Sequence, residues 1–289
     1  MTRTGQRGFR PGFDDLGGRQ LLSTVGGWPF AESSGSAPAI TTFRNNLYVA
    51  WRGFDDHLNI EDVNTGHKIT LPETTSAAPA LAVYNGRLVV AWTGTDPQHH
   101  LNVLSTTDGM YWGDKGTLAQ TTFASDGPAL VAYRGSLVIG WTGTDTELND
   151  AYSADGKSFG PTITFGAYYN ATSWYAPALA VFHGDLNVAW TGTDNRLNLK
   201  DLMTGRGNIS NFTSHNAPSL GTAPNGDLYI AWTAADNQEL HVGDTVTNYG
   251  ILINEYSPYG PSLAFDSAGT RYIAWTGTDH NGSVNYDVV

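Results

Sequence analysis

The chain has no cysteine, few basic residues and no long apolar run. Without Cys among its 289 residues, it can form no disulfide and no thiolate metal site, although the cellular compartment stays open. Asp and Glu total 27 against 15 Lys and Arg, which gives a net charge of −12. This balance argues against nucleic acid or an anionic membrane as partner, and it favours a neutral or cationic small molecule or a glycan. No run of about 18 uncharged apolar residues occurs, so no membrane span is predicted.

No segment shows the hydrophobic period of an α-helix, and a short sequence motif recurs along the chain. The segment VAWTGTD occurs at residues 90–96 and again at 188–194, and four near-copies bring the number of units to six. A fixed period of this size indicates a repeat architecture. The Trp residues of the six copies lie 41 to 49 residues apart: Trp51, Trp92, Trp141, Trp190, Trp232 and Trp275.

Each unit has the pattern of four short strands. In the second unit, runs such as APALAVY and LVVAWTGTD alternate with turn signals such as NGR and TTDG, which is typical of strands joined in hairpins. Four-stranded units of this length predict an all-β protein, a six-bladed β-propeller. The units begin at Ala-Pro or Gly-Pro pairs, a position where a missing N–H is tolerated: Pro38, Pro79, Pro128, Pro177, Pro218 and Pro261.

Residues 1–289 are predicted to form one propeller whose ends meet. The last unit has only three strands. The apolar segment RQLLSTVGG at residues 19–27 would complete the last blade and close the ring, leaving no open sheet edge. Residues 1–18 are basic and Gly-rich without the apolar core of a signal peptide, and we expect a flexible segment there. The predicted blades are 37–76, 77–125, 126–174, 175–215, 216–258, and 259–289 together with 19–36.

Residues that recur in every unit are expected to build the frame. Strand alternation places Leu88, Val90 and Trp92 on one face, so the Trp should pack between adjacent blades. Gly94 suits a close backbone approach, and the Asp after it should cap its own loop by accepting backbone N–H groups. The Asn that follows each apolar anchor also repeats and is expected to be structural, with His241 in its place in unit five.

Function is expected where the units differ, on the face that carries the inter-blade connections and the loops after TGTD. Two residues before each unit's Pro, the sequence places Ser36, Ala77, Asp126, Tyr175, Asn216 and Tyr259. Mixed polar and aromatic groups near an axis suit a small-molecule or sugar pocket, although exposed loop residues would look the same. Candidate acids and bases for catalysis are Asp126, Glu147, Glu239, His57 and His99.

Unit three holds an aromatic insertion, FGAYYNATSWY, at residues 165–175. Tyr168, Tyr169, Trp174 and Tyr175 could offer flat faces to a sugar, or the loop could fold as a lid with its own small core. We therefore add these four residues to Asp126, Asn216 and Tyr259 as predicted ligand contacts. No cofactor or metal is predicted, because calcium would need several convergent oxygens and no D-x-D-x-D loop is present.

Two family resemblances follow from particular motifs. STTDGMYW at 105–112 and SADGKSF at 153–159 resemble degenerate Asp-box turns of sialidases and related propellers. The layout AP-x-L…NGxLxVAWTGTDxxL is similar over all six units to bacterial propeller lectins of the Photorhabdus type. The second resemblance implies a secreted or surface-acting carbohydrate binder, and the family's usual ring has seven blades. The second aromatic residue after GTD is Asn here, so that family's sugar-binding residues do not transfer.

Three functional hypotheses follow. The first is a lectin-like carbohydrate-binding propeller with sites on the loop face. The second is an enzyme with one asymmetric axial pocket, a glycoside hydrolase, lyase or cyclase, in which Asp126 works with neighbouring Tyr, Glu or His residues. The third is a protein-interaction scaffold, which would need a contiguous apolar patch. One deep asymmetric pocket would favour the enzyme, whereas several equivalent notches would favour the lectin.

Overall fold

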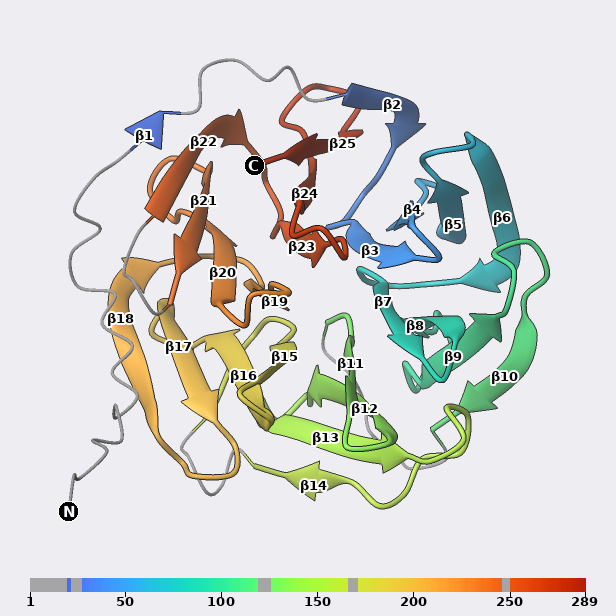
Figure 1. Ribbon diagram of the computed structural model, residues 1–289, viewed down its shortest axis with the longest axis horizontal. Helices are drawn as coiled ribbons and strands as arrows, with labels where there is room; N and C mark the ends of the chain where they lie inside the picture. The colour runs from blue at the N-terminus through green and yellow to red at the C-terminus, as the bar shows by residue number, and fades with distance from the viewer. Residues whose placement is uncertain (1–19, 22–27, 119–125, 166–170, 246–249) are drawn as a thin grey trace.

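A computed structural model describes residues 20–21, 28–118, 126–165, 171–245 and 250–289. Six sheets stand around a central axis like the blades of a propeller (Figure 1), and within each blade the strands follow one another antiparallel from the axis outward. The described residues include no helix that is long and apolar enough to cross a membrane. The predicted all-β, six-bladed propeller is therefore confirmed.

The strands of the first three blades are short and regular. Blade one contains β3 (Ala39–Phe43), β4 (Asn46–Arg52), β5 (His57–Asp62) and β6 (His67–Thr74). Blade two contains β7 (Ala80–Tyr84), β8 (Arg87–Thr93), β9 (Leu101–Thr106) and β10 (Gly113–Thr117). Blade three contains β11 (Ala129–Tyr133), β12 (Ser136–Thr142), β13 (Leu148–Ser153) and β14 (Ile163–Thr164).

The last three blades repeat the plan. Blade four contains β15 (Ala178–Phe182), β16 (Asp185–Thr191), β17 (Arg196–Asp201) and β18 (Gly207–Thr213). Blade five contains β19 (Ser219–Thr222), β20 (Leu228–Thr233), β21 (Glu239–Asp244) and β22 (Gly250–Tyr256). Blade six contains β23 (Ser262–Phe265), β24 (Arg271–Thr276) and β25 (Ser283–Val288).

The N-terminal part of the chain closes the ring. Strand β2 (Trp28–Ser33) pairs antiparallel with β25 and supplies the fourth strand of blade six. Closure by an N-terminal strand is thus confirmed, but the closing strand directly follows the predicted segment at 19–27. Strand β1 (Gln20–Leu21) adds something that the sequence pattern did not predict, because it pairs parallel with β22 and gives blade five a fifth strand. The predicted flexible segment, residues 1–18, lies outside the described residues.

The hydrophobic core is divided among the six interfaces between neighbouring blades, which we call seams. Each seam holds one apolar cluster, and in each cluster the Trp of the repeated motif comes from the later of the two blades around the ring. The six Trp side chains are at most 4% exposed. Because burial of so large a ring contributes roughly 3 kcal/mol, the prediction that Trp packs between blades is confirmed and explains why the residue recurs.

The Thr after that Trp ties each blade to the next. Its hydroxyl donates to the backbone carbonyl of the residue two positions before the next blade's Pro. Blade one has Arg52 at this position in place of Thr. The five bonds are Thr93 to Asp126 (2.9 Å), Thr142 to Tyr175 (2.6 Å), Thr191 to Asn216 (2.6 Å), Thr233 to Tyr259 (2.6 Å) and Thr276 to Ser36 (2.7 Å).

The Gly and Asp of the motif form one turn. Asp194 Oδ1 accepts the backbone N–H of Arg196 at 3.1 Å, and this carboxylate folds back over Gly192. A Cβ atom built on Gly192 would lie 2.6 Å from Asp194 Oδ1. Blade five has Ala234 at the Gly position, and there Asn237 instead accepts the N–H of Glu239 at 3.1 Å. The predicted loop-capping role of the Asp is thus seen, and the Gly is needed to leave room for it.

Candidate functional site

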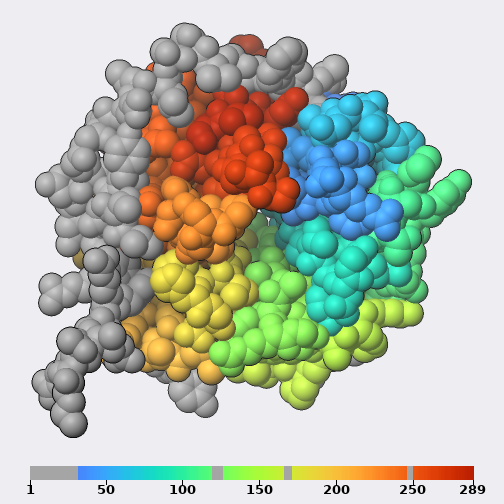
Figure 2. Space-filling model, viewed as in Figure 1, coloured from blue at the N-terminus to red at the C-terminus, as the bar shows by residue number. Residues whose placement is uncertain are grey.

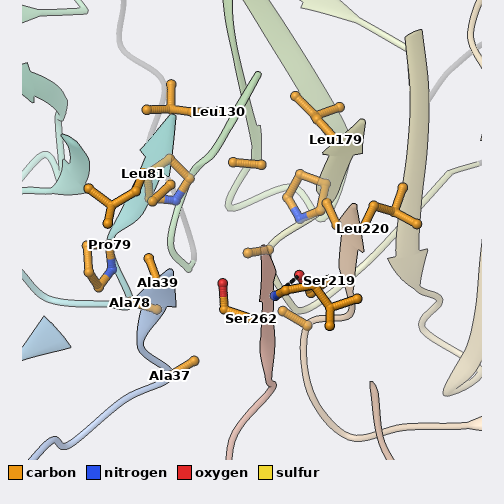
Figure 3. A pocket seen from close by; sticks show the side chains of 18 of the residues that line it. Ala37, Ala39, Ala78, Pro79, Leu81, Leu130, Leu179, Ser219, Leu220 and Ser262 are labelled. Carbon is orange, nitrogen blue, oxygen red and sulfur yellow. Dashed lines mark hydrogen bonds between the residues drawn. The ribbon is translucent and has the colours of Figure 1, made fainter. Parts of the chain in front are cut away.

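The ring axis ends in a small apolar cavity on the face of the inter-blade connections. Figure 2 shows the blades closing tightly around the axis. The space open to water there is about 140 Å³, and its walls are the Ala-Pro pairs and the Leu or Ile residues of the innermost strands. Figure 3 shows these small side chains around the cavity, with Ser219 and Ser262 as polar members. No lining residue is titratable, so this cavity offers neither an acid nor a base.

Asp126, the leading catalytic candidate, stands at the start of blade three and reaches toward blade four. Its Oδ2 accepts the N–H of Ala176 at 2.9 Å and its Oδ1 accepts the N–H of Gly127 at 2.8 Å. Burial raises the pKa of the Asp126 carboxyl, and these two bonds oppose the rise. Tyr175 lies near enough for the Asp126 charge to add to the burial that raises the pKa of its phenol. Asp126 and Tyr175 are therefore brought together, but neither lines the axial cavity.

The other predicted ligand residues are spread around the ring. Trp174 is 58% exposed. Asn216 and Tyr259 are half-buried, and their backbone carbonyls hold the Thr hydroxyls of the neighbouring blades. Tyr168 and Tyr169 lie outside the described residues, so the question of lid or platform for residues 165–175 stays open. Ligand roles for this set remain predictions.

The remaining acid and base candidates lie on four separate blades. His57 Nδ1 lies 3.3 Å from Asp55 Oδ2, and His99 Nδ1 lies 3.3 Å from Ser76 Oγ. Glu147 and Glu239 are half-buried, Glu147 in the loop after the second strand of blade three and Glu239 at the first position of β21 in blade five. None of the four lines the axial cavity. In the described ranges, no three His, Asp or Glu side chains gather as a metal ion would require.

A second cavity opens on the same face, farther from the axis, at the seam between blades five and six. Its volume open to water is about 300 Å³. One wall is Glu255 and Tyr256 of β22, and the other comes from the motif loop and third strand of blade six. The complete lining is Glu255, Tyr256, Trp275, Gly277, Thr278, Asp279, Ser283 and Asn285. We call this space the seam cavity.

The polar groups of the seam cavity are held in place. Asp279 accepts the N–H of Ser283 at 2.8 Å and its hydroxyl at 2.6 Å, and these bonds lower the pKa of the Asp279 carboxyl. Tyr256, 41% exposed, donates its hydroxyl to Glu239 at 3.4 Å. Burial raises the pKa of Glu255, and the charge of Asp287 adds to the rise. Glu239 thus enters the site as a partner that orients Tyr256.

Sequence reasoning missed Glu255 and Tyr256, although a signal was present. Glu stands six residues before the unit's Pro in three units, as Glu32, Glu73 and Glu255. In blade four that position is Phe212, whose ring packs on Trp232 with centroids 5.1 Å apart. The position six residues before the Pro thus holds Glu in three units and another residue in blade four, so the seams differ there.

An unusual carboxyl lies within the seam between blades three and four. Asp150 is 3% exposed at a position that Ile60, Val103 and Leu199 occupy in other blades. Its Oδ2 accepts the Tyr152 hydroxyl at 3.3 Å, and within the described part of the chain its Oδ1 has no partner. Burial raises the pKa of Asp150 to about 6. No described cavity reaches this group, and we assign it no ligand.

Comparison with known proteins gives the fold and no family. No family model and no curated protein matches the sequence. The β-propeller domain of Cps50 (Swd1) from Myceliophteria thermophila is similar, with a TM-score of 0.50 and 12% identity over 88% of this chain and 83% of that chain. A GH43_1 enzyme from Xanthomonas citri has a TM-score of 0.51 and 12% identity over 91% of this chain and 90% of that chain. At such low identity the likeness shows the propeller fold alone.

Proposed function

We propose that this propeller binds carbohydrate on its loop face, with the seam cavity between blades five and six as a binding site. The observation that carries the proposal is the contrast between the two cavities. The axial cavity is apolar and without titratable groups, whereas the seam cavity combines the exposed ring of Tyr256 with hydroxyl, amide and carboxylate groups. Sugars are bound by that combination, because rings stack on their C–H faces and polar groups pair with their hydroxyls.

The experiment is a glycan-array screen followed by calorimetry on Tyr256→Ala. We expect binding to at least one glycan class, and we expect the exposed Tyr256 ring to matter because it forms one wall of the cavity. Met203→Ala is a matched control, since Met203 is 55% exposed on another blade. Absence of binding to every neutral and acidic glycan at millimolar concentration would overturn the proposal.

The alternative, an enzyme that uses Asp126, is supported by one observation. Burial raises the pKa of Asp126 beside Tyr175, and a carboxyl with a raised pKa is better suited to act as a general acid. A screen of chromogenic glycosides and lyase substrates would test this function. Turnover that survives Asp126→Asn would remove Asp126 from the mechanism.

A further inference from the structure

Three seams share one glutamate position. In each of the three blades concerned, the Glu (Glu73, Glu255 or Glu32) comes directly before the outer-strand residue that pairs with the first residue of the third strand. Those pairs are Thr74 with His57, Tyr256 with Glu239, and Ser33 with Ser283. The three glutamates are therefore equivalent in register, and each faces the seam toward the next blade.

Two of these glutamates are neutralised by a lysine of the next blade. Lys68 Nζ lies 2.5 Å from Glu32 Oε2, and Lys115 Nζ lies 2.7 Å from Glu73 Oε2. Each ammonium group also lies over the motif Trp of its own blade, 5.3 Å from the Trp51 ring and 5.5 Å from the Trp92 ring. An ammonium between a carboxylate and an aromatic ring gains from both the charge and the ring quadrupole. In these two seams, the Glu position thus binds an ammonium group.

The third glutamate has no such lysine. Lys68 directly precedes Ile69, which pairs with Ile60. At the equivalent place in blade six Trp28 pairs with Tyr286, and the residue before Trp28 in the sequence is Gly27, which carries no side chain. Among the described residues Glu255 makes no ion pair, and its charged neighbour is another carboxylate, Asp287. The seam cavity opens beside Glu255, and the buried Trp275 belongs to its lining.

A second acceptor in the seam cavity is also unused. In blades one to three, the Asn of the third strand accepts a Thr hydroxyl with its side-chain oxygen, as Asn59 does from Thr70 at 2.6 Å and Asn102 from Thr117 at 2.7 Å. The residue opposite Asn285 is Pro29, which has no donor. The Asn285 amide nitrogen donates to the Ser283 carbonyl at 2.8 Å, and no residue that the structure describes donates a hydrogen bond to its oxygen.

We infer that the seam cavity binds a primary ammonium group, held by Glu255 and the Asn285 amide oxygen, in place of the lysine that pairs with the equivalent Glu in two other seams. Asp279 adds a second negative charge to the lining, and the whole chain carries a net charge of −12, which attracts cations. The ammonium could belong to an amino sugar or to an alkylamine, since the two share this chemistry. This inference rests on the proposed function, because it concerns the same seam cavity. It depends on the negative charge of Glu255, whereas the carbohydrate function depends on the groups that would pair with sugar hydroxyls.

The test is calorimetry at pH 7 and low salt with n-butylammonium, n-butanol, glucosamine and glucose. We expect n-butylammonium and glucosamine to bind at millimolar concentration or below, and the neutral counterparts to bind more weakly. Glu255→Gln keeps the shape and removes the charge, and it should weaken ammonium binding by about tenfold or more, because a bond to a charged group is lost. Glu73→Gln makes the same charge change at a filled seam and should leave the affinity unchanged.

The outcomes separate this inference from the carbohydrate function. Equal binding of n-butanol and n-butylammonium, or an unchanged affinity in Glu255→Gln, would overturn the ammonium site even if glucose bound. Binding of n-butylammonium without any sugar would support the ammonium site and count against the carbohydrate function. Thermal unfolding of Glu255→Gln followed by circular dichroism checks that the variant is folded, and absence of binding by all four probes would overturn the inference.

Discussion

The seam between blades one and two and the seam between blades five and six are built alike, yet one is closed and the other is open. Both bury a motif Trp, Trp92 or Trp275, and both carry a Glu on the outer strand of the earlier blade. In the first, Lys115 fills the space between that Glu and the ring. In the second, a cavity of about 300 Å³ opens there. The frame is thus kept by buried residues, while Lys115 occupies a place in the first seam that no described lysine occupies in the second.

The largest effect is expected from the residue that both seams share. Trp92→Ala and Trp275→Ala each remove a ring that is 1% exposed, and each should lower the free energy of unfolding by about 3–5 kcal/mol, from lost burial and the space left behind. Chemical denaturation followed by fluorescence would measure this. A cost below about 1 kcal/mol at either seam would show that the Trp does not hold the blades together.

The seam between blades three and four tests what happens when an apolar position becomes ionisable. Asp150→Val restores the residue type of Val103 and Val242 and should raise the stability at pH 7. The pKa of Asp150 is raised from 3.8 to about 6 in the fold, so its contribution to stability is full below pH 3.8 and is lost as the pH rises toward 6. The loss is about 3 kcal/mol by the usual value of ~1.4 kcal/mol per pKa unit.

The measurement is denaturant unfolding of wild type and Asp150→Val between pH 4 and pH 7. The gap between the two proteins should widen with pH, because ionisation of the buried carboxyl destabilises only the wild type. The reciprocal variant Val103→Asp is expected to be less stable at pH 7 for the same reason. A gap that does not change with pH would contradict the raised pKa.

A smaller effect is expected at the motif turn. Gly192→Ala would place a Cβ 2.6 Å from Asp194 Oδ1 and should cost about 1–3 kcal/mol, because either the turn or the cap must shift. The matched control is Ala234→Gly in blade five, where Asn237 already caps the loop. Thermal unfolding of the two variants would show whether the Gly is needed for the close approach.

The smallest change in stability is expected for Lys115→Gly, the substitution that makes the seam between blades one and two resemble the seam between blades five and six. Lys115→Gly removes a half-exposed ion pair, which is worth at most about 1 kcal/mol, and it leaves Glu73 without its lysine beside Trp92. We expect a second binding site for n-butylammonium, visible in calorimetry as an increased stoichiometry. An unchanged stoichiometry would show that the seam cavity depends on more than the missing lysine.

The repeated parts of the fold could be predicted because they are local. The strand that begins at Ala39 and the strand that ends at Arg52 belong to one hairpin, so their alternation and their turn residues lie within a few positions of each other. The Asp194 turn is likewise local. The parallel pairing of Gln20 with Ile251 was missed, since no pattern relates residues so far apart in the sequence.

The site was harder to predict for a related reason. Asp126 and Tyr259 were chosen for their place before the Pro, where the sequence varies, yet the axial cavity is lined by the Ala-Pro pairs themselves. Glu255 and Asn285 belong to different blades, and only the packing of β22 of blade five against blade six places them in one cavity. Their significance depends on the lysine that fills the other seams, which the register of the outer strands reveals.

By itself, the sequence determined the number of blades, the four-strand plan, the closing strand and the Trp of each seam, because each follows from a short-range pattern repeated six times. Only the tertiary structure decided which seams are filled and which is open. A cavity is the space left when side chains from two separate units meet, and that space depends on register and packing that no single unit contains.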